Sequence, residues 1–424
     1  MTMGATVDVT VPQRLTDLLA EIDRFIDSEI VPLQAQDDNE RFFDHRREWA
    51  RTDFENGGTP RPEWEELLHE ATRRADAAGF YRYGLASDIG GRDGSQLDMA
   101  VIREHLAHRG LGLHNDLQNE HSIVGNLIYA RLLRLFGTAE QREMIEPVIT
   151  GEMDLAFGLT EPDHGSDATW METTAVRRGS DWVINGAKRW NSGVHSATHD
   201  MVFARTSGKP GDARGISVFL VPIDSPGFEV PFYWWTLNMP TDHAEVLITD
   251  VTVPGSAMFG PEGEGLSVAQ TFVQENRIRQ AASGVGAAQY CIDAAVAYAR
   301  SRVTFGRPLS ERQAVQWPLV ELHTDAELLR TLCRVTATEM DDLAAQGLPA
   351  VTIGHKVSMC NYRANRLVCE AADRAMQVHG GIGYSRHLPF EHIYRHHRRY
   401  RITEGAEEIQ MRRVAGKLFG FLKS

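Results

Sequence analysis

The chain of 424 residues contains only four cysteines, and no two of them form a CxxC pair. Closely spaced cysteine pairs are typical of zinc sites and redox-active dithiols, so their absence argues against both. Isolated cysteines are typical of small buried residues in a reducing compartment. We therefore expect no metal site, and a cytoplasmic protein. The four are Cys291, Cys333, Cys360 and Cys369.

Long apolar runs are also missing. None approaches the roughly 18 residues that a helix needs to cross a bilayer, so no membrane span is expected. The first thirty residues have no apolar stretch of signal-peptide length, and they carry Asp8, Asp17, Glu21 and Asp23. This pattern predicts neither a secretory nor a transit peptide.

Basic residues are in the minority, because 44 Lys and Arg stand against 58 Asp and Glu, giving a formal charge of −14. Binding to nucleic acid or to an anionic membrane needs a basic face, so we expect neither partner. With 42% hydrophobic and 24% charged residues, the composition is typical of a soluble globular protein, either an enzyme or a scaffold. At roughly 150 residues per domain, the length allows two or three domains.

The hydrophobic period changes twice along the chain. Apolar residues recur at three and four positions in the first part, as in Leu15, Leu18, Ile22 and Ile26, which predicts helices. Short β-branched and aromatic runs follow, and long helical segments then return, one from Val268 and one opening at Pro349. The expected fold is α+β and mainly α, with an N-terminal helical domain (1–153), a middle β domain (154–265) and a C-terminal helical domain (266–424).

Two polar segments lie in or beside the predicted β domain. FGLTEPDHGSD (157–167) carries Thr160 and Ser166 in a turn, which is either an ordinary capped turn or a loop that presents hydroxyls and amides to a ligand. WVINGAKRWNSG (182–193) contains Asn-Gly at 185–186, which predicts a hairpin turn. Trp190 and Ser192 are suited to contact a flat ligand, although a lone Trp in a strand is more often a core residue.

Two further segments belong to the C-terminal zone. RVTFGRPL (302–309) places Arg302 and Arg307 near a helix end, where arginines either cap carbonyls or hold a phosphate. QVHGGIGY (377–384) opens the backbone for close approach at Gly380 and Gly381. Glu404 is expected at the start of the final helix, where a Glu is usually a cap.

In their order, LTEPDHGSD, NGAKRWNS, MPTDHAEV, RVTFGRPLSERQAVQ, QVHGGIGY and TEGAEEIQ resemble the acyl-CoA dehydrogenase family. The resemblance extends from about Gln118 to Ala415. It implies an N-terminal helical domain, a middle β domain and a C-terminal four-helix bundle, with FAD between the last two and its adenosine end reaching a neighbouring subunit. A homodimer or homotetramer follows from that arrangement.

The resemblance also implies the roles of individual residues. Leu159, Thr160, Trp190 and Ser192 match positions around the flavin ring. Positions around the diphosphate and adenosine are matched by Arg302, Thr304, Phe305, Gln313, Gln377, Gly380 and Gly381. Glu404 matches the base that removes the α-proton of an acyl-CoA thioester while flavin N5 takes the β-hydride. Substrate contacts are assigned to Ser166, Arg277 and Gly405, and the electron acceptor is expected to be an electron-transferring flavoprotein.

Several alternatives remain open at this point. Some branches of the family carry the base near position 276, where this chain has Asn276 preceded by Glu275; the offset of one residue favours Glu404. Departures at Arg395-His396-His397, Thr403 and Ala406 suggest a branch that handles long or unusual acyl groups. The rival functions are an oxygen-using flavoenzyme, such as an acyl-CoA oxidase or a nitroalkane-oxidase-like protein, and a catalytically silent binding homologue.

Overall fold

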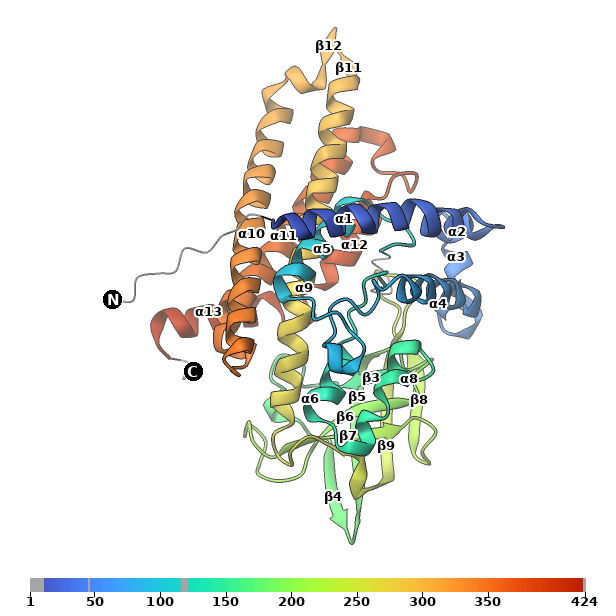
Figure 1. Ribbon diagram of the computed structural model, residues 1–424, viewed down its shortest axis with the longest axis vertical. Coiled ribbons are helices and arrows are strands. Elements are labelled where there is room, and N and C mark those ends of the chain that lie inside the picture. Colours follow the sequence, from blue (N-terminus) through green and yellow to red (C-terminus); the bar gives the residue numbers. More distant parts are fainter. Residues whose placement is uncertain (1–10, 45, 116–120, 422–424) are drawn as a thin grey trace.

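A computed structural model describes residues 11–44, 46–115 and 121–421. Gln118, where the family resemblance begins, lies outside the described residues, and so do Asp8 and the rest of the first ten residues. The last three positions of the expected C-terminal domain are outside as well. Figure 1 shows a sheet at one end of the molecule, long helices reaching the other end, and the N-terminal helices beside them.

The N-terminal zone is helical, as its period predicts. In the first helix, α1 (Gln13–Phe25), the buried residues Leu15, Leu18 and Ile22 follow the 3,4 spacing. A short hairpin of β1 (Thr52–Asp53) and β2 (Thr59–Pro60) interrupts the helices of this zone. The remaining α-helices are α2 (Val31–Ala35), α3 (Glu48–Arg51), α4 (Pro62–Ala77), α5 (Gln96–His108), α6 (Ile128–Phe136), α7 (Ala139–Arg142) and α8 (Ile145–Thr150).

Within the described residues, eight strands of the middle zone form one sheet, in the order β10-β7-β6-β4-β5-β9-β8, with β3 pairing in parallel with β6. Side chains alternate across it: Met201 and Phe203 of β6 face the helices α6, α8 and α9, and Val202 and Ala204 face the opposite core. The strands are β3 (Leu155–Gly158), β4 (Thr174–Arg178), β5 (Asp181–Ser192), β6 (His199–Arg205), β7 (Ile216–Pro222), β8 (Phe228–Tyr233), β9 (His243–Pro254) and β10 (Met258–Phe259).

The C-terminal zone is built on long helices. α9 (Gly265–Ser301) starts at the sheet and ends in a hairpin of β11 (Val303–Thr304) and β12 (Arg307–Pro308) at the far end of the molecule (Figure 1). α5 packs against it so closely that a Cβ on Gly286 would lie 2.1 Å from the carbonyl oxygen of Glu104. The other helices are α10 (Gln313–Ala345), α11 (Gly354–His379), α12 (Phe390–Arg399) and α13 (Glu407–Phe419). The mainly helical fold class with a middle sheet is confirmed.

Three local expectations were wrong. Asn185-Gly186 is not a hairpin turn but lies inside β5, where Asn185 bonds with Asp250 of β9 and the register shifts at Gly186. Pro349 does not open an α-helix, because a 3₁₀ turn over Ala350–Ile353 precedes α11. Glu404 lies in a turn three residues before α13, and not at its start.

All four cysteines are buried and free, as their isolated positions predict. Among the helices of the described residues, none combines the length and the apolar character needed to cross a membrane. The same residues contain no cluster of His, Cys, Asp and Glu suited to a metal ion.

Candidate functional site

The turn between α12 and α13 presents Glu404 to α9. Its carboxylate Oε1 accepts a hydrogen bond from Asn276 Nδ2 at 3.2 Å, and its backbone carbonyl accepts one from Arg277 Nε at 2.9 Å. Glu404 has φ of +55° and Gly405 has φ of +84°, so two successive residues are left-handed. A Cβ on Gly405 would lie 2.8 Å from Arg277 Nη2, which explains the glycine there.

Arg277 is a buried cation beneath this turn, with 5% of its surface exposed. It also donates from Nη1 to the hydroxyl of Ser358 on α11 at 3.3 Å. Burial lowers the pKa of Arg277 to about 10, although the charge of Glu404 opposes that change. At this pKa the guanidinium is protonated near neutral pH, so it fixes the backbone of the turn through charge-assisted hydrogen bonds.

Glu275 has a different environment from its neighbour Asn276. Its carboxylate pairs with Arg131 of α6 at 3.0 Å and accepts two bonds of 2.8 Å from Gln96 of α5. Asn276 instead joins Glu404 to Asn126, whose amide donates to Asn276 Oδ1 at 3.1 Å. The residue at 276 therefore faces Glu404, whereas the residue at 275 is held by the N-terminal helices.

Leu159 and Thr160 directly follow β3, and their carbonyls face β5. The backbone N–H of Arg189 donates to the Thr160 carbonyl at 2.9 Å, and Lys188 Nζ lies 3.4 Å from the Leu159 oxygen. Ser166 lies farther along the same loop and is exposed. The loop thus has an anchored half beside β5 and an exposed half.

Trp190 and Ser192 stand at the end of β5. Trp190 has φ of +69° where the register of β5 on β9 shifts, and 45% of its surface is exposed. Its ring lies 4.9 Å from that of Trp234, and Ser192 Oγ lies 2.7 Å from His243 Nδ1. An exposed indole held in an uncommon backbone conformation, beside a hydroxyl and a loop, suits a flat ring system with a polar edge.

A buried cluster of four polar residues supports this part of the site: Glu161, Lys188, Asn191 and Asp200. Lys188 Nζ lies 2.9 Å from Glu161 Oε1, and Asn191 Nδ2 donates to Asp200 Oδ2. The exposed fraction is 4% for Glu161 and 0% for the other three. Sequence reasoning missed this cluster, although Glu161 and Lys188 stand inside the quoted motifs, because burial of a charged residue is not readable from a motif.

Burial decides the direction of the pKa shift for two of the three ionisable members, Lys188 and Asp200, but not for Glu161. It lowers the pKa of Lys188 to about 8 against the attraction of Glu161, and it raises the pKa of Asp200 to about 7 against the bond from Asn191. Burial also acts to raise the pKa of Glu161, but Lys188 and the N–H donors of Glu172 and Thr173 outweigh it and hold this pKa below its usual value. The site is therefore backed by charges that water does not screen.

The remaining predicted residues lie at the other end of the molecule. Arg302, Thr304 and Phe305 belong to the β11–β12 hairpin, which Figure 1 places far from the sheet. Phe305 is 97% exposed, and the Arg312 guanidinium, which donates to the Thr304 carbonyl at 2.6 Å, lies over its ring. Gln313 opens α10 and is exposed.

The end of α11 lies near this hairpin. The ring of His379 is 4.4 Å from that of Tyr298, close to the end of α9, so Gln377, Gly380 and Gly381 share that end of the molecule. A Cβ on Gly380 or Gly381 would meet no atom within 4 Å, so their backbone is open to an incoming group. One chain thus brings Glu404 together with Asn276 and Arg277, and Trp190 together with Ser192. The residues near the β11–β12 hairpin, which we call the hairpin group, lie far from both sets: Arg302, Thr304, Phe305, Gln313, Gln377, Gly380 and Gly381.

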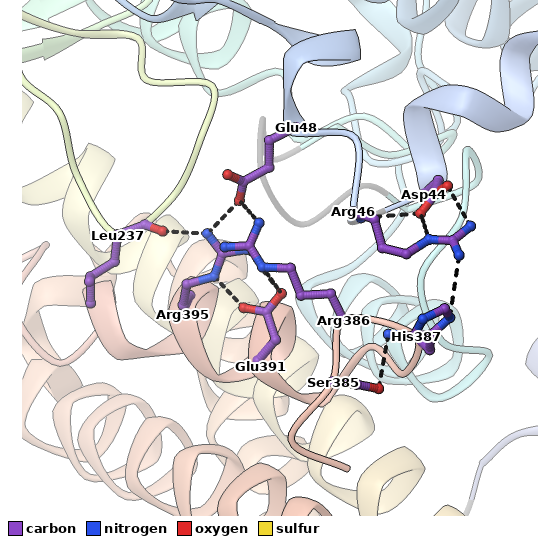
Figure 2. Close-up of polar contacts among 9 residues, drawn as sticks. All are labelled: Asp44, Arg46, Glu48, Leu237, Ser385, Arg386, His387, Glu391 and Arg395. Atoms are coloured by element: carbon purple, nitrogen blue, oxygen red, sulfur yellow. Dashed lines mark hydrogen bonds and ion pairs between the residues drawn. The ribbon is translucent and has the colours of Figure 1, made fainter. Parts of the chain in front are cut away.

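Figure 2 shows a second polar network, the interdomain cluster of Glu48, Leu237, Arg386, Glu391 and Arg395. Arg395 of α12 bonds to Glu48 of α3 at 3.0 Å, to the Leu237 carbonyl at 2.8 Å and to Glu391 at 2.6 Å. Arg386 lies 3.2 Å from the same Glu48. This cluster joins the helical N-terminal zone, a loop after β8 and the C-terminal zone.

The run of basic residues from Arg395 to Arg401 is therefore not an open cationic face. Arg395 is paired as described, Arg401 pairs with Glu407 at 3.0 Å, and His396 and His397 are buried. Burial holds the pKa of His396 below its ordinary value. The two histidines that replace the common family residues are thus interior groups.

Comparison with known proteins decides the family. The middle-domain model of acyl-CoA dehydrogenases matches residues 156–251, and the C-terminal-domain model matches residues 263–419. The chain belongs to the acyl-CoA dehydrogenase family. It is an FAD-dependent acyl-CoA dehydrogenase, as the motif order predicts, and the predicted enzyme class and cofactor are confirmed.

Individual relatives agree with this assignment. A probable acyl-CoA dehydrogenase, FadE2, of Mycobacterium tuberculosis is 35% identical over 67% of this chain and 70% of its own length. The caffeyl-CoA reductase-Etf complex subunit CarC of Acetobacterium woodii is 30% identical over 83% of this chain and 90% of its own. The structure of a putative acyl-CoA dehydrogenase from Mycobacterium abscessus superposes with a TM-score of 0.82 at 26% identity, over 97% of this chain and all of that one.

Proposed function

We propose that this acyl-CoA dehydrogenase removes the α-proton of its substrate with Glu404. The observation that carries the proposal is the 3.2 Å contact from Asn276 to the Glu404 carboxylate, since it directs the carboxylate toward α9. The competing carboxylate, Glu275, is held by Arg131 and Gln96 instead. The residue types and their geometry both favour Glu404 as the base.

The same turn serves the substrate carbonyl. The backbone N–H of Glu404 donates to the thioester oxygen and stabilises the negative charge that develops there as the α-proton leaves. Arg277 acts from behind, because it holds the Glu404 carbonyl and so fixes the peptide that follows, at Gly405. Ser166 binds the CoA arm from the exposed half of its loop. Bound FAD supplies the acceptor for the β-hydride, which completes the α,β-double bond.

The cofactor is held by residues from both ends of the molecule. Leu159, Thr160, Trp190 and Ser192 surround the flavin ring, and their loop, exposed indole and hydroxyl fit its shape and polar edge. The diphosphate and adenosine are held by the hairpin group of Arg302, Thr304, Phe305, Gln313, Gln377, Gly380 and Gly381. Because one chain keeps these two groups apart, the hairpin group serves the cofactor of a second copy, and the enzyme is a homodimer or homotetramer.

The base is tested by Glu404→Gln. The variant keeps its yellow FAD, but anaerobic bleaching by an acyl-CoA slows by about 10²–10⁴-fold, the usual contribution of a general base. Glu275→Gln is the matched control, because this carboxylate lies one residue from the alternative base position and bonds elsewhere. A Glu404→Gln enzyme that bleaches at the wild-type rate would remove Glu404 from the role.

The acyl group of the substrate is identified by a second experiment, in which the anaerobic bleaching of the wild-type enzyme is compared across acyl-CoAs of different length and branching.

The assembly is tested by analytical ultracentrifugation of the yellow protein. A monomer that retains FAD would contradict the two-copy site. Arg302→Ala is expected to lower FAD content although the residue lies far from Trp190, because it acts in the second copy.

We propose an electron-transferring flavoprotein as the electron acceptor, in keeping with a relative named as a subunit of an Etf complex. Stopped-flow reoxidation of the reduced enzyme by such a flavoprotein, compared with reoxidation by oxygen, separates this function from that of an oxidase. A cytoplasmic location, favoured by four free cysteines, is checked by cell fractionation.

A further inference from the structure

Lys188 is a charged residue in an unusual place. Its side chain is completely buried inside the sheet, and its ammonium contacts two groups of one short segment, Glu161 Oε1 at 2.9 Å and the Leu159 carbonyl at 3.4 Å. A lysine is almost never fully buried unless it is paired, so the position calls for a physical reason.

The contacts of β5 cover three successive residues of that segment. Lys188 Nζ reaches Leu159 and Glu161, and the backbone N–H of Arg189 donates to the Thr160 carbonyl between them at 2.9 Å. Two neighbouring residues of β5 thus fix the segment at Leu159, Thr160 and Glu161. These include the two residues to which the flavin edge is assigned.

Glu161 extends the support in the other direction. Its two carboxylate oxygens accept bonds from the backbone N–H of Glu172 at 2.6 Å and of Thr173 at 2.9 Å. The loop that leaves β3 is therefore closed at both of its ends by one side chain, and Lys188 supplies the opposite charge that this carboxylate needs inside the protein.

Asn191 and Asp200 lie against Gly158, the residue just before the segment from Leu159 to Glu161. A Cβ on Gly158 would lie 2.9 Å from Asn191 Nδ2 and 2.9 Å from Asp200 Oδ2, so glycine is required there. The charged groups facing Asp200 come from β5, where Lys188 attracts it; the β3 residues beside it, Ala156 and Gly158, carry no charge. The whole turn from Gly158 to Glu161 rests on the buried cluster.

Stability alone does not explain such a cluster. Well-packed apolar residues of similar volume often replace a buried ion pair without loss of stability, whereas fixed polar contacts can specify one conformation. We propose that Lys188 is a positioning residue of the FAD site, which holds Leu159 and Thr160 from inside the sheet in the conformation that receives the flavin edge. This inference rests on the proposed placement of the flavin at those two residues.

The test uses the double variant Lys188→Met/Glu161→Gln. Removing both charges avoids an unpaired buried carboxylate, so the melting temperature should fall less than in Lys188→Met alone. The carboxamide can still accept one of the two backbone N–H bonds of Glu161, and the Leu159 carbonyl loses its ammonium partner. We expect FAD affinity to fall about tenfold, which corresponds to about 1.4 kcal/mol, and the visible absorption and circular dichroism of the remaining bound flavin to change. Lys356→Met is the matched control, because Lys356 pairs with Glu339 on the distant helices α10 and α11 and is 37% exposed.

The outcomes separate the two proposals. A Thr160→Ala variant whose bound flavin has the affinity and the spectrum of the wild type would overturn the placement of the ring, and with it this inference. A Thr160 variant that does perturb the flavin, together with a folded double variant of unchanged affinity and spectrum, would overturn the role of Lys188 alone. If the double variant does not fold, Lys188→Gln/Glu161→Gln replaces it, because its two carboxamides can bond to each other; the shorter side chain at 188 still leaves Leu159 unsupported, so the same loss is expected.

Discussion

The buried cluster and the interdomain cluster are both networks of opposite charges, but they differ in their contact with water. Lys188 and Asp200 are inaccessible to solvent, whereas the side chains of Arg386 and Glu48 are 45% and 23% exposed. Charges inside a protein interact strongly and are costly when a partner is lost, whereas exposed pairs are screened and usually contribute little. Similar distances in the two networks therefore correspond to different energies and different roles.

The largest effect is expected from Lys188→Met alone. The substitution leaves Glu161 buried without its cation, which destabilises the protein by about 3–5 kcal/mol, the usual cost of breaking a buried pair from one side. Chemical denaturation followed by the fluorescence of the sheet tryptophans measures this loss. A loss below about 1 kcal/mol would mean that water reaches the buried cluster and that its charges are screened like those of the interdomain cluster.

The next effect concerns pH. The folded pKa of Asp200 is raised to about 7, above the ordinary value of about 4, so between these pH values the folded protein keeps a proton that the unfolded chain has lost. Its contribution to stability is therefore present below pH 4 and decreases as the pH rises toward 7. Asp200→Asn should remove this decrease and, at pH 8, stabilise the protein by on the order of 2 kcal/mol. Melting temperatures of the variant and the wild type from pH 4 to 8 show whether their difference grows with pH; a constant difference would contradict the assignment.

A smaller effect is expected in the interdomain cluster from Arg395→Met. The residue is half-buried and bonds to three partners, but water reaches those partners, so we expect a loss of about 1 kcal/mol. Raising the salt concentration should reduce the difference between variant and wild type, because exposed charges are screened. Denaturation at low and high salt measures this, and a salt-independent loss of 3 kcal/mol or more would place Arg395 with the buried charges.

The smallest effect is expected from Arg386→Gln, which removes a side chain that is 45% exposed and lies 3.2 Å from Glu48. Since Arg395 still holds Glu48, the change in stability should stay below about 0.5 kcal/mol. A thermal shift assay on the two arginine variants in parallel gives the order directly. Equal losses of stability would show that Arg386 and Arg395 contribute equally to the interdomain cluster.

Much of the fold follows from the sequence because its signals are local and periodic. The 3,4 spacing in α1 correctly predicted a helix, the β-branched runs correctly predicted strands, and the order of the motifs identified the family. Asn185-Gly186 predicted a turn wrongly, because the same dipeptide also suits a strand whose register shifts at that point. Gly186 is needed there for Thr173 to approach, since a Cβ on it would lie 2.3 Å from Thr173 Oγ1. That contact joins residues 13 positions apart and leaves no mark in the dipeptide.

The site was less readable than the fold. The sequence predicts Glu404 at the start of the final helix, but the residue lies in a turn before it, with a left-handed backbone whose carbonyl is held by Arg277, more than a hundred residues away in the chain. Burial of Lys188 and Asp200 likewise depends on how strands pack. Residue types at motif positions were predictable, whereas the groups that support them from behind were not.

In the two-copy assembly proposed above, the length of α9 determines where the hairpin of one copy meets the other. Ser301 lies 25 positions after Asn276 on one uninterrupted helix, about 38 Å at 1.5 Å per residue. Rise and rotation are coupled in a helix, so adding one residue would move the hairpin by only about 1.5 Å but would turn it by about 100°. The length of α9 thus sets both the distance and the orientation of the hairpin. Relatives that keep the same pairing of copies should therefore vary in the length of this segment only by close to whole helical turns.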